Sequence, residues 1–197
     1  MTNDFDIDLK RILKEYGIAE SDLLTIVTKL NFIEIKKKEQ FLEAGTICKR
    51  LGILLNGLLM ATFVTDSGKI NVNRFFYSSQ NIVVCNFESF KNRSISNESI
   101  IALEDSNLAF FTYEDLEELY LNVPAMQRIG REIAELSYIN AMKRIYELQI
   151  HDTQTRVNRF FQKQPELFNR VNKNYLASYL RINRNDLSKA LSKAQRK

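Results

Sequence analysis

The sequence predicts an α+β protein in which an antiparallel sandwich or barrel lies between N-terminal helices and a helical C-terminal part. Three observations support this fold class. Apolar residues recur with a helical period at both ends of the chain, short β-rich runs fill residues 32–112, and no helical pattern separates those runs. Many short strands of this kind are typical of antiparallel sheets. With 197 residues, the chain can hold one mid-sized domain and a small one.

Residues 5–30 have the pattern of two helices. The first ends at Gly17, and its apolar stripe consists of Leu9, Ile12, Leu13 and Tyr16. Ser21 is expected to cap the second, whose apolar side consists of Leu24, Val27 and Leu30.

The middle of the chain changes to short β-rich runs. Asp66, Ser67 and Gly68 lie between two of them and predict a hairpin turn. The expected strands lie at residues 32–35, 53–55, 58–64, 70–77, 82–85, 99–103 and 108–111.

After the strands the helical period returns. A short helix is expected at 114–121, and Pro124 suits the first turn of a longer one that extends to about Gln149. Packing against the sandwich explains part of its apolar side. Its length and continuity favour pairing with a second copy, through a seam of Met126, Ile129, Ile133, Leu136, Ile139, Met142, Ile145 and Leu148.

Residues 171–193 have the pattern of two short helices with a corner at residues 181–183. Asn183 is a suitable N-cap for the second helix, and Asp186 favours the positive end of its dipole. One side is apolar, formed by Leu176, Ala177 and Leu180 in the first helix and by Leu187, Ala190 and Leu191 in the second. The opposite side of the second helix is polar and consists of Arg184, Asn185, Ser188, Lys189 and Ser192.

That polar side has the residue types that recognise DNA. Arg pairs with the guanine edge, Asn with the adenine edge, and Ser or Lys can reach a base or a phosphate. They lie in the first turns of the second helix, the part that a helix-turn-helix module inserts into the major groove. An ordinary solvated face on a helical hairpin is the alternative.

The charge distribution favours a nucleic-acid partner. Residues 151–197 hold 11 Lys and Arg against three acids, a net charge of +8, and because the whole chain carries +4, residues 1–150 carry −4. A basic end on an acidic body suits docking on a polyanion. A membrane surface is the other polyanion, but these short helices lack a broad apolar face to insert.

Other functional classes lack their sequence signals. No run approaches membrane-spanning length, and the N-terminus does not have the pattern of a signal peptide, so we expect a cytoplasmic protein. Cys48 and Cys85 are too few and too far apart in sequence for a metal site, and each is expected to be a buried thiol without a disulfide. His151 is expected to be a surface or capping residue.

The sequence gives no sign of a catalytic site. No phosphate loop, catalytic triad or metal motif is present, and the acidic pairs 104–105 and 117–118 are expected to be solvated. We therefore predict no enzyme activity and no catalytic residues.

Several stretches carry a family resemblance. They are F-L-E-A-G-T (41–46), L-N-G-L-L (55–59), I-A-L-E-D-S (101–106), N-V-P (122–124) and K-N-Y-L-A-S-Y-L (173–180), which continues as R-I-N-R-N-D-L-S-K. Together with the order of the elements, they resemble the Crp/Fnr family of bacterial transcription regulators. The likeness covers nearly the whole chain and is most specific in the final helix pair.

The resemblance implies a domain plan and partners. It implies a jelly-roll-like β-roll (a double-stranded β-helix) at 1–121 that resembles cyclic-nucleotide-binding domains, a dimerisation helix at 122–150 and a helix-turn-helix at 151–197. The expected partners are double-stranded DNA, a second copy and RNA polymerase, without a membrane. The residues expected to contact DNA are Arg184, Asn185, Ser188, Lys189, Lys173, Asn174 and Tyr175, and those expected at the dimer interface are Met126, Ile129, Ile133, Leu136, Ile139 and Met142.

The final helix pair departs from the family pattern in two ways. Arg181 replaces the glycine at the corner, so an ordinary residue must form that turn. The sequence after the second helix is too short for the β-hairpin wing that many members carry, and residues 196–197 would have to supply its phosphate contacts.

The effector site also departs from the pattern. Members that bind a cyclic nucleotide use a Phe-Gly-Glu sequence and an Arg-Ser pair, whereas residues 76–90 here lack Gly-Glu, and Ile95 and Ser96 replace Arg-Ser. We therefore expect no binding of cyclic AMP. Two cysteines are too few for an iron–sulfur cluster, and His151 is misplaced for a haem ligand.

Two alternatives remain for the role of the β-roll, and two for the function of the whole chain. The roll either binds an unidentified organic effector or is only a scaffold for the dimer. The chain is expected to be a homodimeric, sequence-specific DNA-binding regulator. The alternative is a small-molecule-sensing module that acts through a protein partner without binding DNA.

Overall fold

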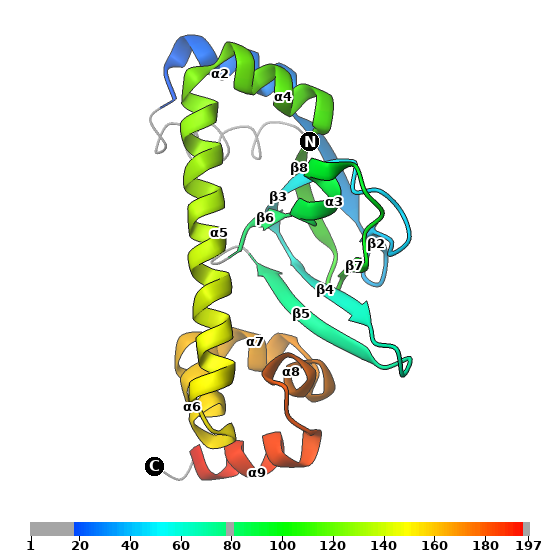
Figure 1. Ribbon diagram of the computed structural model, residues 1–197, viewed down its shortest axis with the longest axis vertical. Helices are drawn as coiled ribbons and strands as arrows, with labels where there is room; N and C mark the ends of the chain where they lie inside the picture. The colour runs from blue at the N-terminus through cyan, green and yellow to red at the C-terminus, as the bar shows by residue number, and fades with distance from the viewer. Residues whose placement is uncertain (1–17, 78–80, 195–197) are drawn as a thin grey trace. The chain divides into compact units, whose positions relative to one another are not determined.

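The computed structural model describes residues 18–77 and 81–194, with side chains to Ser192. The helix expected before Gly17 and the basic tail at 196–197 lie outside the described residues. The chain divides into two compact units, which are described separately below. Unit 1 comprises residues 1–60 and 75–135, and unit 2 comprises residues 61–74 and 136–197. Figure 1 shows the elements of both in chain order.

Helix α2 (Glu20–Thr28) begins earlier than the sequence suggests. The predicted cap at Ser21 is wrong, because the extended residue before the helix is Ala19 and Ser21 lies inside the first turn. The predicted apolar side is also rotated. Leu23 and Ile26 are buried, whereas Leu24 is 72% exposed. Of the three predicted residues, Leu30, which follows the helix, is buried.

The strands form two antiparallel four-stranded sheets rather than a closed barrel within the described residues. The first sheet has the order β1-β8-β3-β6, with β1 (Asn31–Ile35), β8 (Ser106–Thr112), β3 (Arg50–Asn56) and β6 (Val83–Val84). The second has the order β2-β7-β4-β5, with β2 (Gln40–Leu42), β7 (Glu98–Ala102), β4 (Leu58–Val64) and β5 (Ile70–Tyr77). All seven predicted strands are present.

Two short elements of unit 1 were not predicted. Strand β2 has three residues and follows a charged stretch, and helix α3 (Phe87–Asn92) has six. Neither is long enough to show a period in the sequence. A local cap fixes the start of α3, since the side chain of Asn86 accepts a hydrogen bond from the backbone N–H of Ser89 at 2.9 Å.

The inner faces of the two sheets form the core of unit 1. A Cβ atom at Gly52 in β3 would lie 3.1 Å from Phe41 of the second sheet and 3.1 Å from Leu108 of its own sheet. Gly57, with φ 102°, permits a still closer approach, because a Cβ there would lie 2.2 Å from the hydroxyl of Ser106. The two sheets therefore pack as a β-roll, and Leu54, Leu58, Leu59, Ile100 and Leu108 are all buried in unit 1.

The predicted hairpin turn is confirmed at the end of β4. The backbone N–H of Thr65 donates to the carbonyl of Lys69 at 2.9 Å, and that of Gly68 donates to the carbonyl of Thr65 at 2.8 Å. Gly68 has a positive φ of 76°, which suits the residue type at this position. Residues 61–74, which include this turn, belong to unit 2.

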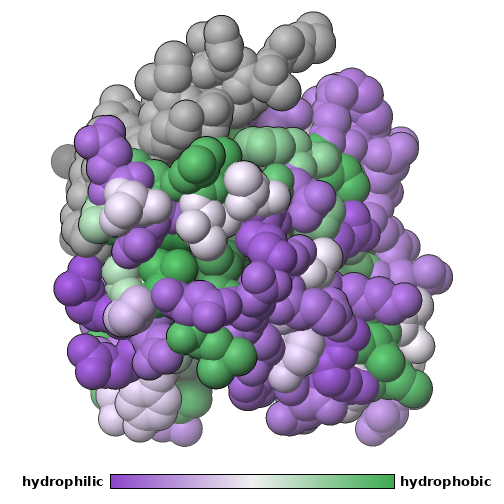
Figure 2. All heavy atoms as spheres, turned by 90° about the horizontal axis from the view of Figure 1, so that it is seen from above, coloured by the Kyte–Doolittle hydropathy of each residue, from purple (hydrophilic) through white to green (hydrophobic). Residues whose placement is uncertain are grey.

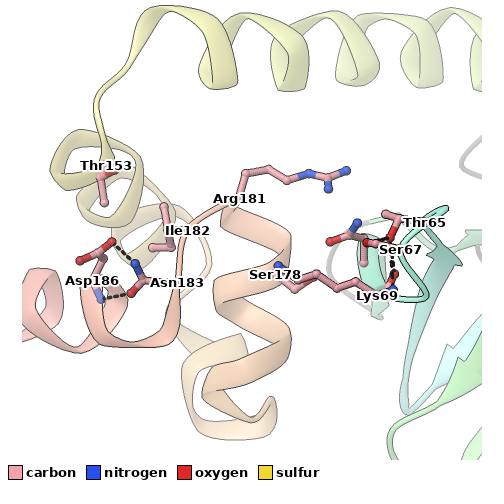
Figure 3. Close-up of a pocket in the computed structure, with 10 residues that line it drawn as sticks. Thr65, Ser67, Lys69, Thr153, Ser178, Arg181, Ile182, Asn183 and Asp186 are labelled. Carbon is pink, nitrogen blue, oxygen red and sulfur yellow. Dashed lines mark hydrogen bonds between the residues drawn. The ribbon is translucent and has the colours of Figure 1, made fainter.

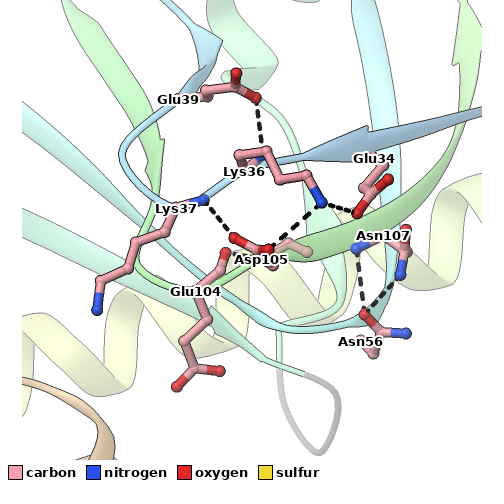
Figure 4. A network of polar contacts seen from close by, with 9 residues as sticks. Glu34, Lys36, Lys37, Glu39, Asn56, Glu104, Asp105 and Asn107 are labelled. Carbon is pink, nitrogen blue, oxygen red and sulfur yellow. Dashed lines mark hydrogen bonds and ion pairs between the residues drawn. The ribbon is translucent and has the colours of Figure 1, made fainter.

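Charged side chains at one end of the first sheet pair with one another (Figure 4). The ammonium of Lys36 contacts Glu34 and, at 3.5 Å, Asp105. The backbone N–H of Lys37 donates to Asp105 at 2.8 Å, which holds the pKa of that carboxyl below its usual range. We call this group the sheet-end network. Asp105, one of the two acidic residues predicted to be solvated, therefore also fixes the backbone at Lys37.

Two helices follow the sheets. They are α4 (Tyr113–Asn122), capped by Thr112, and α5 (Pro124–Ile150), in which Pro124 is the first residue as predicted. Among the described residues of unit 1, Leu24 in α2 is 72% exposed and Leu121 in α4 is 81% exposed. The view from above shows hydrophobic residues in several separate places among hydrophilic ones (Figure 2).

Candidate nucleic-acid interface

Four helices build the C-terminal part of unit 2 (Figure 1). They are α6 (Thr153–Lys163), α7 (Pro165–Arg170), α8 (Lys173–Leu180) and α9 (Arg184–Ala194). Helices α8 and α9 are the predicted pair, with the corner at residues 181–183. Helix α6 lies against α9, and the side chain of Gln154 donates to the carbonyl of Ala190 at 3.1 Å.

Asn and Asp side chains cap the helices that matter for the site. The backbone N–H of Thr155 donates to Asp152 at 2.7 Å, and that of Tyr175 donates to Asn172 at 3.0 Å. The predicted cap of α9 is confirmed, since the backbone N–H of Asp186 donates to the side chain of Asn183 at 2.8 Å. These caps fix where α6, α8 and α9 begin.

The corner before α9 is formed by Arg181 in the left-handed conformation, with φ 57° and ψ 44°. Most non-glycine residues avoid this region. Here two backbone hydrogen bonds close the turn, from Arg181 to Ser178 at 3.1 Å and from Ile182 to Ala177 at 3.0 Å. The prediction that an ordinary residue can form this corner is confirmed.

The apolar sides of α8 and α9 are buried as predicted. Leu187 is 0% exposed, and the other members of this side are at most 9% exposed. They are Leu176, Ala177, Leu180, Ala190 and Leu191. The apolar sides of the two helices therefore form a small core, and the opposite side of α9 is left facing solvent.

The outer side of α9 faces solvent. Arg184, Asn185 and Lys189 are exposed, as is Ser192, and Ser188 is half-buried. Within the described part of the chain, Arg184, Asn185 and Lys189 make no side-chain hydrogen bond or ion pair. We call Arg184, Asn185, Ser188 and Lys189 the reading face. All four come from the first two turns of one helix.

The predicted contacts of α8 lie at its beginning. Lys173 and Asn174 are exposed, and Tyr175 is half-buried. The first turn of α8 therefore presents a basic and a polar side chain to solvent.

Unit 2 also contains a feature that the sequence did not indicate. The hairpin of residues 61–74 contacts α8 and the corner, where the backbone N–H of Val72 donates to the hydroxyl of Ser178 at 2.9 Å and the guanidinium of Arg181 lies 5.4 Å from the ring centre of Phe63. An open polar pocket of about 570 Å³ lies between them (Figure 3). The hairpin side of the pocket consists of Thr65, Ser67, Lys69 and Asn71. Turn residues reveal a hairpin in sequence, but not what it will contact.

Arg144 of helix α5 contacts helix α8. Its guanidinium lies 4.0 Å from the ring centre of Tyr179 in α8 and also donates to the carbonyl of Tyr179. Burial lowers the pKa of Arg144, which still keeps its charge. Nearby, Glu147 accepts from Lys163 of α6 at 2.8 Å. His151 is half-buried, and its carbonyl accepts from Arg156 at 2.7 Å.

The predicted dimer seam of α5 divides into two parts. Met126 and Ile129 are buried inside unit 1, at 5% and 7% exposed. Ile133 and Met142 are half-buried. Farther along, large apolar side chains remain exposed, and they are Leu136 (54%), Tyr138 (67%), Ile139 (44%), Ile145 (44%), Tyr146 (51%) and Ile150 (71%).

The region expected to hold a cyclic nucleotide is occupied by local contacts. Arg93, which ends α3, lies 4.8 Å from the ring centre of Tyr113. Ser96 accepts from the backbone N–H of Glu98 at 3.0 Å, and the side chain of Asn86 donates to Glu98 at 3.0 Å. Ile95 is 70% exposed.

The described residues give no metal or membrane signal. No three His, Cys, Asp or Glu side chains group there as metal ligands. No helix within residues 18–77 and 81–194 combines the length and hydrophobicity needed to span a bilayer.

Comparisons with known proteins support the fold. No family model matches the sequence, and no curated protein matches it either. Among solved structures, FixK2 from Bradyrhizobium japonicum aligns with a TM-score of 0.70 at 14% identity, covering 84% of each chain. The c-di-GMP-responsive global regulator CLP from Xanthomonas campestris aligns with a TM-score of 0.68 at 18% identity, covering 90% of this chain and 92% of that one.

A third structure carries a family name. A protein from Eubacterium rectale, described as a transcriptional regulator of the Crp/Fnr family, aligns with a TM-score of 0.70 at 16% identity, covering 91% of this chain and 84% of that one. The neighbours are transcription regulators rather than enzymes. At these identities the likeness concerns architecture. The chain therefore has the β-roll and C-terminal helix fold of Crp/Fnr transcription regulators.

Proposed function

We propose that this protein is a homodimeric transcription regulator that reads DNA by inserting α9 into the major groove. The observation that carries the proposal is the reading face. Its residues extend from a helix whose other side is fully buried, and its charged and amide groups have no partner within the described chain. A rigid helix with unpaired Arg, Asn and Lys suits the edges of base pairs.

The four residues have separate roles in this proposal. Arg184 and Asn185 contact base edges, because their planar groups can form two hydrogen bonds with guanine and adenine. Ser188 and Lys189 lie one turn later and contact a base or a phosphate. Lys173, Asn174 and Tyr175 at the start of α8 contact the phosphate backbone and set the position of α9.

The affinity that does not depend on sequence comes from the charge of +8 on residues 151–197. The hairpin of unit 2 adds Lys69, which lines the pocket beside the corner. Such charges release counterions from DNA, so binding must weaken steeply as salt rises.

We further propose that two copies pair through the exposed part of α5. Large apolar side chains on an otherwise polar helix favour burial against a partner. A two-fold dimer presents two copies of α9, as reading two half-sites requires. Residues 1–121 then form the effector domain, 122–150 the dimer helix and 151–197 the DNA-binding domain, with RNA polymerase as a further partner.

The effector in this proposal is an unidentified organic molecule rather than cyclic AMP. Arg93 stacks on Tyr113, and Ser96 is engaged in its own turn, so neither is available to hold a cyclic phosphate. A buried phosphate without such partners would be costly.

The test is fluorescence anisotropy of a labelled duplex with the purified protein over a salt series. We expect the affinity to fall on the order of 10³-fold or more between 50 and 200 mM salt, as for a protein with about 6–10 phosphate contacts. Sedimentation of the same samples should give a dimer. A protein that binds no duplex at 50 mM salt would favour the module that acts through a protein partner.

A further inference from the structure

The two cysteines of the chain lie side by side although they are far apart in sequence. Cys48 lies two residues before β3, and Cys85 directly follows β6. Their Sγ atoms are 3.9 Å apart, and the two residues are 1% and 0% exposed. The chain has no other cysteine. The expectation that each is a buried thiol is confirmed, but their proximity could not be inferred from the sequence.

Contacts with α3 position the backbone on which both cysteines lie. The backbone N–H of Cys48 donates to the hydroxyl of Ser89 at 2.9 Å, and its carbonyl accepts from Arg93 at 3.4 Å. Cys85 directly precedes Asn86, which caps α3. The backbone on both sides of the thiol pair is therefore tied to one short helix, Cys48 by hydrogen bonds and Cys85 by the chain itself.

The environment favours the thiolate form of Cys48. The hydrogen bond with Cys85 lowers the pKa of Cys48 to about 7, against the opposing effect of burial, with help from backbone hydrogen bonds. At neutral pH the thiolate is then a substantial fraction, and the thiolate is the form that reacts with oxidants.

We propose that Cys48 and Cys85 are a redox-active pair that hydrogen peroxide or an organic hydroperoxide oxidises to an intrachain disulfide. The two sulfur atoms are already in contact and need to approach by roughly 2 Å to reach bonding distance. No other thiol in the chain competes for the reaction. This inference does not depend on DNA binding.

The chemistry balances in two steps. The Cys48 thiolate attacks one peroxide oxygen, the O–O bond breaks, and the departing hydroxide takes up a proton to leave water and a sulfenic acid. The sulfur of Cys85 then attacks the sulfenic sulfur, the S–O bond breaks, and the second hydroxide leaves as water with the proton of Cys85. Two thiols lose two electrons and two protons. Hydrogen peroxide is reduced to two waters, and an organic hydroperoxide to one alcohol and one water, because its alkoxide leaves in place of the first hydroxide.

Access to the buried pair is expected through β6. This strand has two residues at the edge of the first sheet, paired with Gly52 and Ile53 of β3. A short edge strand needs little free energy to open locally. A small peroxide should therefore reach the sulfur atoms, whereas a bulky aromatic disulfide reagent should react more slowly.

The test begins with the reduced full-length protein treated with hydrogen peroxide at pH 7.5, then denatured, alkylated and analysed by mass spectrometry. We expect both alkylation sites to disappear together, with a mass lower by two hydrogens in a chain of monomer size, and dithiothreitol to restore both sites. Oxygen additions at either cysteine, disulfide-linked dimers or two thiols that remain alkylated would each contradict the proposal.

Single-cysteine variants test which thiol reacts first. In Cys85→Ser, whose hydroxyl can still donate a hydrogen bond to Cys48, Cys48 should accumulate as sulfenic acid that dimedone traps. In Cys48→Ser the thiolate proposed to react first is gone, so trapping at Cys85 should be at least about tenfold slower. Equal trapping in the two variants would contradict the assignment of Cys48 as the nucleophile. Circular dichroism of both variants shows whether they are folded. The mass measurement on the wild-type protein tests the disulfide even if a variant does not fold.

Discussion

Two groups of exposed polar residues differ in how they are paired. In the sheet-end network, Lys36 contacts Glu34 and Asp105, and Asp105 also accepts from the backbone N–H of Lys37 (Figure 4). On the reading face, Arg184 and Lys189 have no such partner in the described chain. Both groups are hydrophilic and would look alike in a hydropathy profile. Unpaired donors on a rigid helix are what distinguish a surface prepared for a partner from one that is already satisfied.

The largest expected effect comes from removing the support beneath the reading face. Replacing the fully buried Leu187 with Ala should destabilise unit 2 by about 2–5 kcal/mol, because a buried leucine is lost and a cavity remains. Urea unfolding followed by circular dichroism measures this. Asn185→Ala on the exposed side of the same helix is the matched control and should stay within about 0.5 kcal/mol. Equal losses in the two variants would mean that α9 does not have a buried and an exposed side.

A second effect tests whether the exposed apolar part of α5 forms the dimer interface. Ile139→Glu should weaken the dimer by ~2–3 kcal/mol, because each copy would bury an unpaired carboxylate in the interface. Sedimentation velocity over a concentration series measures the change. Asn140→Glu, at the neighbouring exposed position, adds the same charge off the apolar stripe. A dimer that tolerates Ile139→Glu as well as Asn140→Glu would place the interface elsewhere.

A third effect contrasts the two polar groups directly. Arg184→Ala should cost ~1–3 kcal/mol in binding to its best DNA site and relax the preference at one base pair. Lys36→Ala removes a positive charge from the sheet-end network and should leave DNA affinity unchanged. Anisotropy with matched and mismatched duplexes measures both. If Arg184→Ala weakened every duplex equally, Arg184 would be a phosphate contact rather than a base contact.

The smallest effect concerns an ion pair inside unit 2. Burial raises the pKa of Glu147, but the hydrogen bond from Lys163 and nearby positive charges outweigh it and hold that pKa below its ordinary value. A lowered pKa means that the stabilisation is present at neutral pH and is lost as the pH falls below the ordinary glutamate range near 4.3. Glu147→Gln should cost ~0.5 kcal/mol at pH 7, since solvent screens the pair, and nothing at pH 3. Unfolding midpoints that differ equally at both pH values would contradict this.

Local signals made much of the fold predictable. The bounds of β4 and β5 agree with the sequence because Gly57 and the turn ending at Gly68 delimit alternating and β-branched residues. The corner and cap of α9 were predictable because Asn183 acts on residues within its own first turn. The reading face followed from the same helical period that buried Leu187.

Contacts between distant segments could not be predicted. Nothing near Ser67 indicates that its hairpin contacts α8, and nothing in the sequence indicates that Cys48 meets Cys85. The buried side of α2 could not be predicted from Ser21 and the apolar spacing, because the packing of Leu23 and Ile26 decides it. Local propensity is a weaker influence than tertiary burial in such short helices.

The central claim is that α9 reads DNA sequence. The most direct test is to select the members of a randomised DNA library that bind the purified protein and to sequence them at two salt concentrations. The account predicts an enriched two-fold-symmetric motif, half-sites about one helical turn apart, and a steep loss of yield at the higher salt. Repeating the selection with Arg184→Ala should change one position of each half-site. Bound DNA without an enriched motif would contradict the reading of sequence by α9 and leave only a basic surface.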